Sequence, residues 1–381
     1  MPPSVAASES TNLARKLTDE VLIPRAAEID RQRAFPTENF ADIASSGLLG
    51  LMVPAAAGGS GAGLSTLASV LEEVGRGCAS TAMCYLMHCC ATAVIAAKAS
   101  PEQAERWLRP IANGRLIGTL AFSERGTGAH FYNPEIQAHV NGSYLLSGRK
   151  SFVTSGGYAD LYLALVKASP SADGLDVVVI EKGSAGLSFE GSWDGLGMAG
   201  NSSVRMVLDE VSVPLDRGIG GEGAGADLVF GVVAPTFMVG VASVNVGIAQ
   251  AALDTAVKHA TSRTYPPDGK PLASIQAIQF YLAEMKIATD GARALVQRAA
   301  GLADSADPGA LPAVMEAKIA ASDAVIEVTN KAMQVGGGQA YSRGMSLERH
   351  FRDGRASAVM APTTEVLKEW LGKLQCGLPL F

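Results

Sequence analysis

The densest run of reactive side chains is one histidine followed by two cysteines, His88, Cys89 and Cys90. Imidazole and thiolate groups are common zinc ligands, but consecutive residues on a helix point about 100° apart, so this triplet cannot close on one ion. We therefore expect no metal site here and interpret the thiols as small buried residues of a core helix. A lone histidine on an apolar helix is ordinarily a satisfied core residue, and a substrate-facing, catalytic His88 is the alternative.

A second candidate is a glycine-rich stretch after the middle of the chain. Gly218, Gly220 and Gly223 match the GxGxxG spacing of dinucleotide-binding loops. That loop needs a preceding strand within a βαβ unit, whereas these glycines follow the sequence PLDR at 214–217. The sequence also holds no GxxxxGK(S/T) phosphate loop and no GxSxG nucleophile elbow. The glycine-rich stretch is therefore predicted to be a linker.

Composition narrows the class of protein. The 381 residues are 48% hydrophobic and 18% charged, with a net charge of −6. The chain can build a large core, but it has no basic surface for nucleic acid or for an anionic membrane. The longest apolar run, 82–97, is shorter than the roughly 20 residues that span a bilayer, and the N-terminus has no signal pattern. With five irregularly spaced cysteines, the sequence predicts a cytoplasmic protein without disulfides.

Hydrophobic periodicity divides the chain into three parts. We predict an N-terminal helical domain (1–118), a middle β domain (119–225) and a C-terminal helical bundle (226–381). In the first part, Ser100 followed by Pro101 has the form of a capped helix start. The remaining helical patterns of the first and last parts cover 12–31, 65–98, 232–262, 275–302 and 311–335.

The middle part has the two-residue period of strands. Residues 135–140 alternate, Asn141 and Gly142 supply a tight turn, and 143–146 return, which predicts a hairpin. Short strands of this kind predict an antiparallel sandwich or barrel. Further strands are expected at 161–166, 177–180 and 203–213.

Four sequence blocks resemble, in order and spacing, those of the acyl-CoA dehydrogenase family. The first is AFSERGTGAH (121–130), similar to the family's T-E-P-G-A-G-S-D loop, and the second is SGRKSFVTSGG (147–157), similar to N-G-x-K-x-W-I-T-N-G-G. The third is GKPLASIQAIQF (269–280), which follows Arg263. The fourth joins QVGGG (334–338), RHFRDGR (349–355) and MAPTTE (360–365), similar to Q-x-x-G-G, E-R-x-x-R-D-A-R and Y-E-G-T-x-E/Q.

This resemblance implies an α+β fold: a helical domain, an antiparallel β domain and a C-terminal four-helix bundle. It implies FAD between the β domain and the bundle, with a neighbouring subunit completing the site in a homotetramer. Ser123 would bond the pyrimidine edge of the flavin, Thr154 would bond near its N5 atom, and Phe152 would replace the usual tryptophan against the ring. Arg263 and Gln276 would hold the diphosphate and adenosine end from the partner subunit. The other expected cofactor contacts are Phe122, Gly128, Gln334, Gly337, Gly338, Thr363 and Glu365.

The sequence departs from the family where the substrate should bind. The family removes a weakly acidic α-proton with a glutamate, which most members place where this chain has Ala361 and others where it has Phe237. Where the family has the residues that anchor coenzyme A, this chain has Pro235 and Met238. None of these four side chains can accept a proton or bind a phosphate. In the first block, the sequence AH (129–130) also replaces the family's Ser-Asp.

Three functions are compatible with this pattern. The first is α,β-dehydrogenation of an acyl-CoA with a relocated base, with an electron-transferring flavoprotein as acceptor. The second is a monooxygenase of the same fold, which takes reduced FAD or FMN from a flavin reductase, acts on a small aromatic or amine substrate and needs no α-proton base. His88 would then act beside the flavin as a proton donor or as an orienting residue. The third is a non-catalytic partner subunit of an active homologue.

Overall fold

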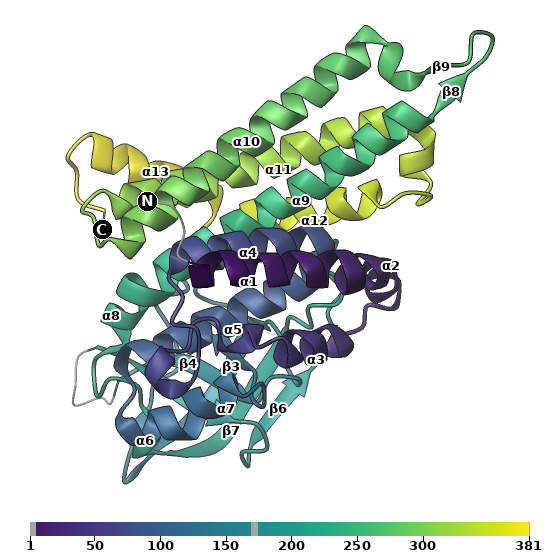
Figure 1. Cartoon of the computed structure of the whole chain (residues 1–381). Helices are drawn as coiled ribbons and strands as arrows, with labels where there is room; N and C mark the ends of the chain where they lie inside the picture. Colours follow the sequence, from purple (N-terminus) through teal and green to yellow (C-terminus); the bar gives the residue numbers. More distant parts are fainter. Residues whose placement is uncertain (1–4, 169–173, 381) are drawn as a thin grey trace.

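The computed structural model describes residues 5–168 and 174–380. Figure 1 shows a β part at one side of the molecule, helices of the N-terminal part over it, and long helices on the other side. The predicted cap is present, because the Ser100 side chain accepts the Gln103 N–H at the start of α6. The N-terminal helical elements are α1 (Val5–Leu17), η1 (Thr18–Leu22), α2 (Ile23–Gln32), α3 (Thr37–Ser45), η2 (Leu48–Gly50), η3 (Ala55–Ala57), α4 (Leu64–Gly77), α5 (Ala79–Lys98), α6 (Pro101–Gln103), η4 (Ala104–Leu108) and α7 (Arg109–Ala112).

The β part contains two sheets, ordered β1-β4-β5 and β2-β3-β7-β6. One strand pair departs from the antiparallel expectation, because β1 runs parallel to β4. The chain leaves β1, forms the hairpin β2–β3 in the other sheet, and only then returns to β4, so the two strands can share a direction. The strands are β1 (Gly118–Ala121), β2 (His139–Val140), β3 (Ser143–Val153), β4 (Leu161–Lys167), β5 (Leu175–Glu181), β6 (Leu187–Glu190) and β7 (Val204–Pro214).

The predicted hairpin forms, but its first strand is shorter than the sequence indicates. Only His139 and Val140 pair with β3, across a turn in which Gly142 has a φ of 70°. The preceding residues alternate in polarity, yet the N–H groups of Glu135 and Ile136 bond to the Glu124 carboxylate, and the residues that follow bridge to Lys167 of β4 rather than to β3. A side chain has therefore taken the backbone donors that a strand would have used.

The C-terminal part is built from long antiparallel helices. The glycine-rich stretch connects β7 to it through the turn η5 (Leu215–Arg217), and α9, α10 and α11 pack in sequence, with α12 against α9 and α11. A small antiparallel hairpin joins α9 to α10. The elements are α8 (Gly225–Leu228), η6 (Val229–Val233), α9 (Ala234–Ser262), β8 (Thr264–Tyr265), β9 (Lys270–Pro271), η7 (Leu272–Ser274), α10 (Gln276–Asp304), α11 (Ala310–Tyr341), α12 (Leu347–Val359) and α13 (Thr364–Gln375).

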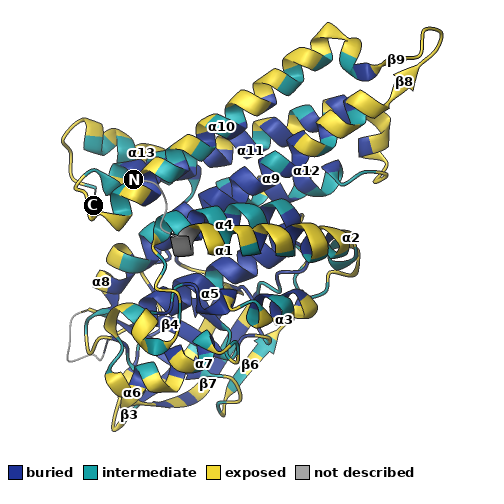
Figure 2. Cartoon of the chain, viewed as in Figure 1, coloured by how far each residue is buried: buried dark blue, intermediate teal, exposed yellow. Residues whose placement is uncertain are grey.

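Among the residues that the structure describes, two helical segments are long and apolar enough to cross a bilayer by length and composition alone, Ala79–Lys98 and Gly225–Ser262. Their most apolar windows are 83% and 67% buried inside the molecule. Figure 2 shows the same, with α5 and much of α9 buried between other elements. We therefore identify both as core helices, whose apolar surface the fold itself covers.

Candidate active site

The first two sequence blocks lie side by side. The Ser151 N–H donates to the Ser123 carbonyl at 2.7 Å, and the Thr119 hydroxyl donates to the Thr154 carbonyl at 2.8 Å. These bonds tie the loop after β1 to the end of β3. Ser123 is half-buried and Thr154 is buried, with its own hydroxyl 2.8 Å from the Ser203 hydroxyl. Phe122 is buried beside them.

Phe152 stands out from this surface. Its side chain is 70% exposed, and its φ of 53° is unusual for an aromatic residue. The β3–β7 register shifts between Lys150 and Val153, so Phe152 lies in a bulge that turns it outward. The Trp193 ring meets it edge-on at 6.4 Å between centroids. Strained, solvent-facing aromatic positions of this kind are typical of ligand sites, and the polar atoms of Ser123 and Thr154 lie on the same loop pair.

A buried ion pair supports the two blocks from behind. The Lys150 ammonium contacts the Glu124 carboxylate at 2.5 Å, and both side chains are at most 2% exposed. Lys150 also donates to the carbonyls of Phe122 and Leu165. Glu124 also accepts hydrogen bonds from the N–H groups of Glu135 and Ile136, and together with the ion pair these bonds fix the loop that carries Ser123. The sequence reasoning missed this pair, although the alternation along β3 places Lys150 on the inward face.

The positions that the sequence predicts to face the substrate are apolar. Ala361 and Phe237 are half-buried and pack against the main hydrophobic core, as does Met360. Met238 is buried within the helical bundle, and Pro235 lies in the first turn of α9. Neither position at which a family member would carry its glutamate has a proton acceptor here. Neither Ala361 nor Phe237 could therefore remove an α-proton.

His88 has no free ring nitrogen. Its Nε2 bonds the Leu49 carbonyl at 2.9 Å, and its Nδ1 accepts the Gly118 N–H at 3.1 Å. A carbonyl accepts and an N–H donates, so the ring must be the neutral Nε2–H tautomer. Complete burial lowers the His88 pKa to about 4, and the neighbouring thiols are buried as well. His88 therefore serves the core, and no catalytic role is proposed for it.

The third block lies at the other end of the molecule. Arg263 follows α9 and Gln276 begins α10, so the antiparallel packing places both at the end of the bundle that carries the β8–β9 hairpin. Figure 1 shows this hairpin projecting away from the β part of the same chain. Both residues are exposed, and the Arg263 guanidinium lies 5.1 Å from the Tyr265 ring centroid. One chain alone therefore does not bring these residues to Phe152.

The fourth block divides between two places. Gln334, Gly337 and Gly338 are exposed near the C-terminal end of α11, and Gly337 interrupts the helix with a φ of 55° and a ψ of −142°. Thr363 caps α13, because its hydroxyl accepts the Val366 N–H at 3.4 Å. Glu365 is exposed in the first turn of α13. One predicted cofactor contact of the first block, Gly128, is likewise exposed, and its φ is 54°.

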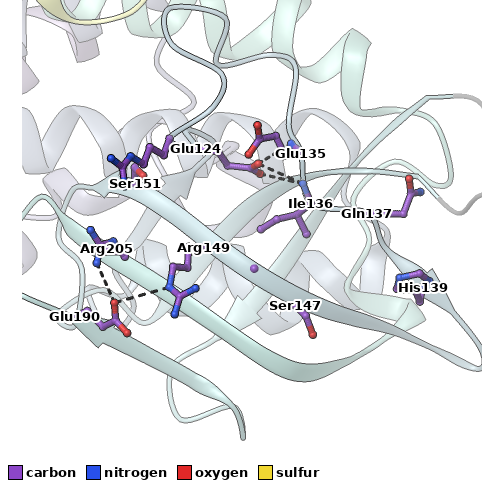
Figure 3. Close-up of a pocket in the computed structure, with 12 residues that line it drawn as sticks. Glu124, Glu135, Ile136, Gln137, His139, Ser147, Arg149, Ser151, Glu190 and Arg205 are labelled. Carbon is purple, nitrogen blue, oxygen red and sulfur yellow. Dashed lines mark hydrogen bonds and ion pairs between the residues drawn. The ribbon is translucent and has the colours of Figure 1, made fainter.

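Figure 3 shows a groove of about 640 Å³ on the outer face of the sheet that contains β3. It reaches Glu124 and Ser151, which are next in the chain to Ser123 and Phe152. Its charges largely compensate one another: Glu190 lies 3.1 Å from Arg205 and 3.9 Å from Arg149. Such a balanced lining gives no net charge that would select an ion. The remaining lining residues are Arg125, Glu135, Ile136, Gln137, His139, Ser147 and Gly148.

Comparison with known proteins identifies the class. Models of the N-terminal, middle and C-terminal domains of acyl-CoA dehydrogenases match residues 7–115, 119–211 and 237–374. The chain therefore belongs to the acyl-CoA dehydrogenase family, and it is a flavin-dependent oxidoreductase with FAD as its cofactor. The three-part fold that the sequence predicted is thereby confirmed.

Similar proteins extend over nearly the whole chain. A cyclohex-1-ene-1-carbonyl-CoA dehydrogenase of Geobacter metallireducens is 34% identical, over 95% of this chain and 96% of that protein. An NADH-dependent acryloyl-CoA reductase of Anaerotignum propionicum is 33% identical, over 93% of this chain and 91% of that protein. The human mitochondrial short-chain specific acyl-CoA dehydrogenase is 33% identical, over 92% of this chain and 85% of that protein. The structure of butyryl-CoA dehydrogenase from Megasphaera elsdenii superimposes with a TM-score of 0.92 at 28% identity, covering 99% of both chains.

The residues of the first two blocks suit a flavin. Phe152 offers an exposed ring for a flat aromatic system, and the Thr154 hydroxyl offers a polar group close to it. When bound, FAD supplies the two-electron acceptor that receives hydride from a substrate. Phe152 would supply an aromatic wall and the Thr154 hydroxyl a hydrogen bond, with the buried Lys150–Glu124 pair as a rigid support.

Proposed function

We propose that the protein catalyses α,β-dehydrogenation of an acyl-CoA thioester and passes the electrons to an electron-transferring flavoprotein. One observation supports this most directly: exposed Phe152 stands beside Ser123 and Thr154 in a chain whose three parts all match the family. The relatives named above act, by their names, on acyl-CoA thioesters. The free cysteines support a cytoplasmic location.

In this proposal, Thr154 bonds near flavin N5, Ser123 bonds the pyrimidine edge and Phe152 packs against the ring. Phe122, Gly128, Thr363 and Glu365 complete the contacts within one subunit. A neighbouring subunit contributes Arg263, Gln276, Gln334, Gly337 and Gly338, in a homotetramer. Figure 1 shows the β8–β9 hairpin, where α9 ends and α10 begins, projecting away from the β part of the same chain, which supports such a division.

The α-proton is the difficulty for this function. Ala361 and Phe237 cannot act as bases, so dehydrogenation requires a base at a third position. The same observation favours a second candidate, a monooxygenase fed by a flavin reductase, because that chemistry removes no α-proton. A small aromatic or amine molecule would be its substrate, and FMN could replace FAD. A non-catalytic subunit is the third possibility.

The experiment is anaerobic mixing of the FAD-loaded protein with a series of acyl-CoAs, followed by air. Bleaching of the flavin absorbance by one thioester is the expected result. If no thioester bleaches the flavin, and the chemically reduced protein forms a transient peroxide-like flavin spectrum in air, the monooxygenase replaces the dehydrogenase. If neither signal develops, the protein acts as a non-catalytic subunit.

A further inference from the structure

A buried polar cluster lies between three helices of the bundle. Its members are Lys318 and Ser322 of α11, Asn245 of α9 and Ser357 of α12. All four are at most 1% exposed. Lys318 has no carboxylate within ion-pair distance in residues 5–168 and 174–380, and burial lowers its pKa to about 8. Because an unpaired buried ammonium is costly, this lysine requires an explanation.

The Lys318 ammonium occupies the end of a helix. The last backbone bond of α12 runs from the Met360 N–H to the Ala356 carbonyl at 3.1 Å. The next one, from the Ala361 N–H to the Ser357 carbonyl, is not formed in the part of the chain that the structure describes. Lys318 donates to that carbonyl at 3.0 Å instead. A cation at this end also complements the partial negative charge of a helix C-terminus.

Two more bonds hold the same residue. The Ser357 hydroxyl accepts from the Asn245 amide at 2.5 Å and lies 2.6 Å from the Ser322 hydroxyl. One turn earlier, a side chain on Gly354 would come 2.8 Å from Val325 of α11, so the two helices approach closely there. The last turn of α12 is therefore fixed to α9 and α11 through both its backbone and its side chain.

The segment 360–363 begins directly after this fixed turn and ends at Thr363, the cap of α13. It carries Ala361, the position of the absent base, and Thr363, a proposed flavin contact. We propose that Lys318 is a positioning residue: by ending α12 at Val359, it sets the path of segment 360–363 against the flavin. This inference rests on the proposed contact between Thr363 and FAD.

The test compares Lys318→Met with Lys286→Met in the FAD-loaded, full-length protein. Methionine keeps the aliphatic length but removes the donor, and Lys286 is an exposed lysine of α10 that pairs with Asp290. We expect Lys318→Met to bind FAD about tenfold more weakly, the size of a lost charge-assisted hydrogen bond, and to change the visible circular dichroism of bound FAD. Lys286→Met should change neither. Unchanged affinity and dichroism in folded Lys318→Met would overturn the proposal.

A pH series of the circular dichroism of bound FAD adds a measurement that a general loss of stability would not change. The flavin dichroism should change near pH 8 in the parent and in Lys286→Met, but not in Lys318→Met. The charged groups that act on Lys318 are Glu365 and Lys368 of α13 and Asp323 of α11. A dichroism change that persists unaltered in Lys318→Met would show that a group other than Lys318 causes it and would count against the proposal.

Two further variants keep the test decisive. If Lys318→Met does not fold, Lys318→Gln retains an amide donor without a charge, and it should bind FAD with intermediate affinity and show no change near pH 8. Thr363→Val separates this inference from the function on which it rests. Weaker FAD binding in Thr363→Val together with parental binding in Lys318→Met overturns only the positioning role. Parental binding in both variants overturns the Thr363 contact as well.

Discussion

The flavin side and the substrate side of the candidate site differ in the groups that they offer. The flavin side presents hydroxyls and an exposed ring, supported by the buried Lys150–Glu124 pair. The substrate side presents Phe237 and Ala361, both packed with the core. The two sides come from separate elements, β1 and β3 on one side and α9 and the segment after α12 on the other. Hydride acceptance and proton acceptance can therefore change independently in this fold.

Restoring a carboxylate on the substrate side should give the largest effect. A positioned general base contributes on the order of 10²- to 10⁴-fold in rate, so Ala361→Glu should accelerate anaerobic flavin bleaching by an acyl-CoA by that amount. Val359→Glu is the control, because it adds the same charge at an exposed position two residues earlier. Equal rates in the two variants would show that position 361 does not face the thioester, and a gain in Phe237→Glu alone would place the base on α9.

Removing the support of the flavin side should have the next largest effect. Lys150→Met leaves the Glu124 carboxylate buried without its partner, which costs about 3–5 kcal/mol. Urea unfolding should report this loss, and purified protein should carry less flavin. Lys167→Met changes an exposed lysine at the end of β4 and should leave both unchanged. Equal stability of the two variants would mean that the ion pair does not support the loop.

The pH dependence of stability should reveal His88 beneath the flavin side. Its pKa is lowered from 6.5 to about 4, so the unfolded chain binds the proton more tightly between these values. The contribution of His88 to the free energy of unfolding is fully present above pH 6.5 and declines by about 3 kcal/mol as the pH falls to 4. Asp353, whose pKa burial raises to about 6, contributes in the opposite direction. The measurement is therefore the difference in the free energy of unfolding between the parent and His88→Gln as a function of pH. Parallel curves for the two proteins would contradict the prediction.

The smallest effect is expected from one hydroxyl at the flavin. Thr154→Ala removes the proposed contact near N5, and a neutral hydrogen bond of about 1 kcal/mol corresponds to roughly fivefold slower flavin reduction. Ser203→Ala removes the protein partner of the same hydroxyl but leaves Thr154 in place. Equal reduction rates in the parent and in Thr154→Ala would show that this residue lies elsewhere relative to the ring.

Periodicity and turn chemistry predicted most elements of the fold. The hairpin turn at Asn141 and Gly142 was predicted, and the helices α9 and α10 were predicted within two residues of their observed bounds, whereas α11 runs six residues beyond its predicted end. The strand β1 was missed because its four residues are all buried and show no alternation. Its parallel pairing depends on the return of the chain after a distant hairpin, which no local pattern encodes.

Buried charges were the part of the site that sequence reasoning missed. The sequence analysis assigned no role to Lys150 or Lys318, and lysine is a residue type that is seldom buried. Both have positions that indicate burial: Lys150 on the inward face of β3, and Lys318 on the same stripe of α11 as Val314, Ser322 and Val325. Their partners are remote in sequence, at Glu124 and Ser357, so only the folded chain identifies them.

The projecting β8–β9 end of the bundle has a consequence for how the holoenzyme forms. If Arg263 and Gln276 act on the flavin of a neighbour, a lone protomer holds only half of each cofactor site. Cofactor loading and subunit association then share one equilibrium, so each drives the other by mass action. Flavin content should fall on dilution, even at saturating substrate. Added FAD should in turn drive dispersed protomers to assemble.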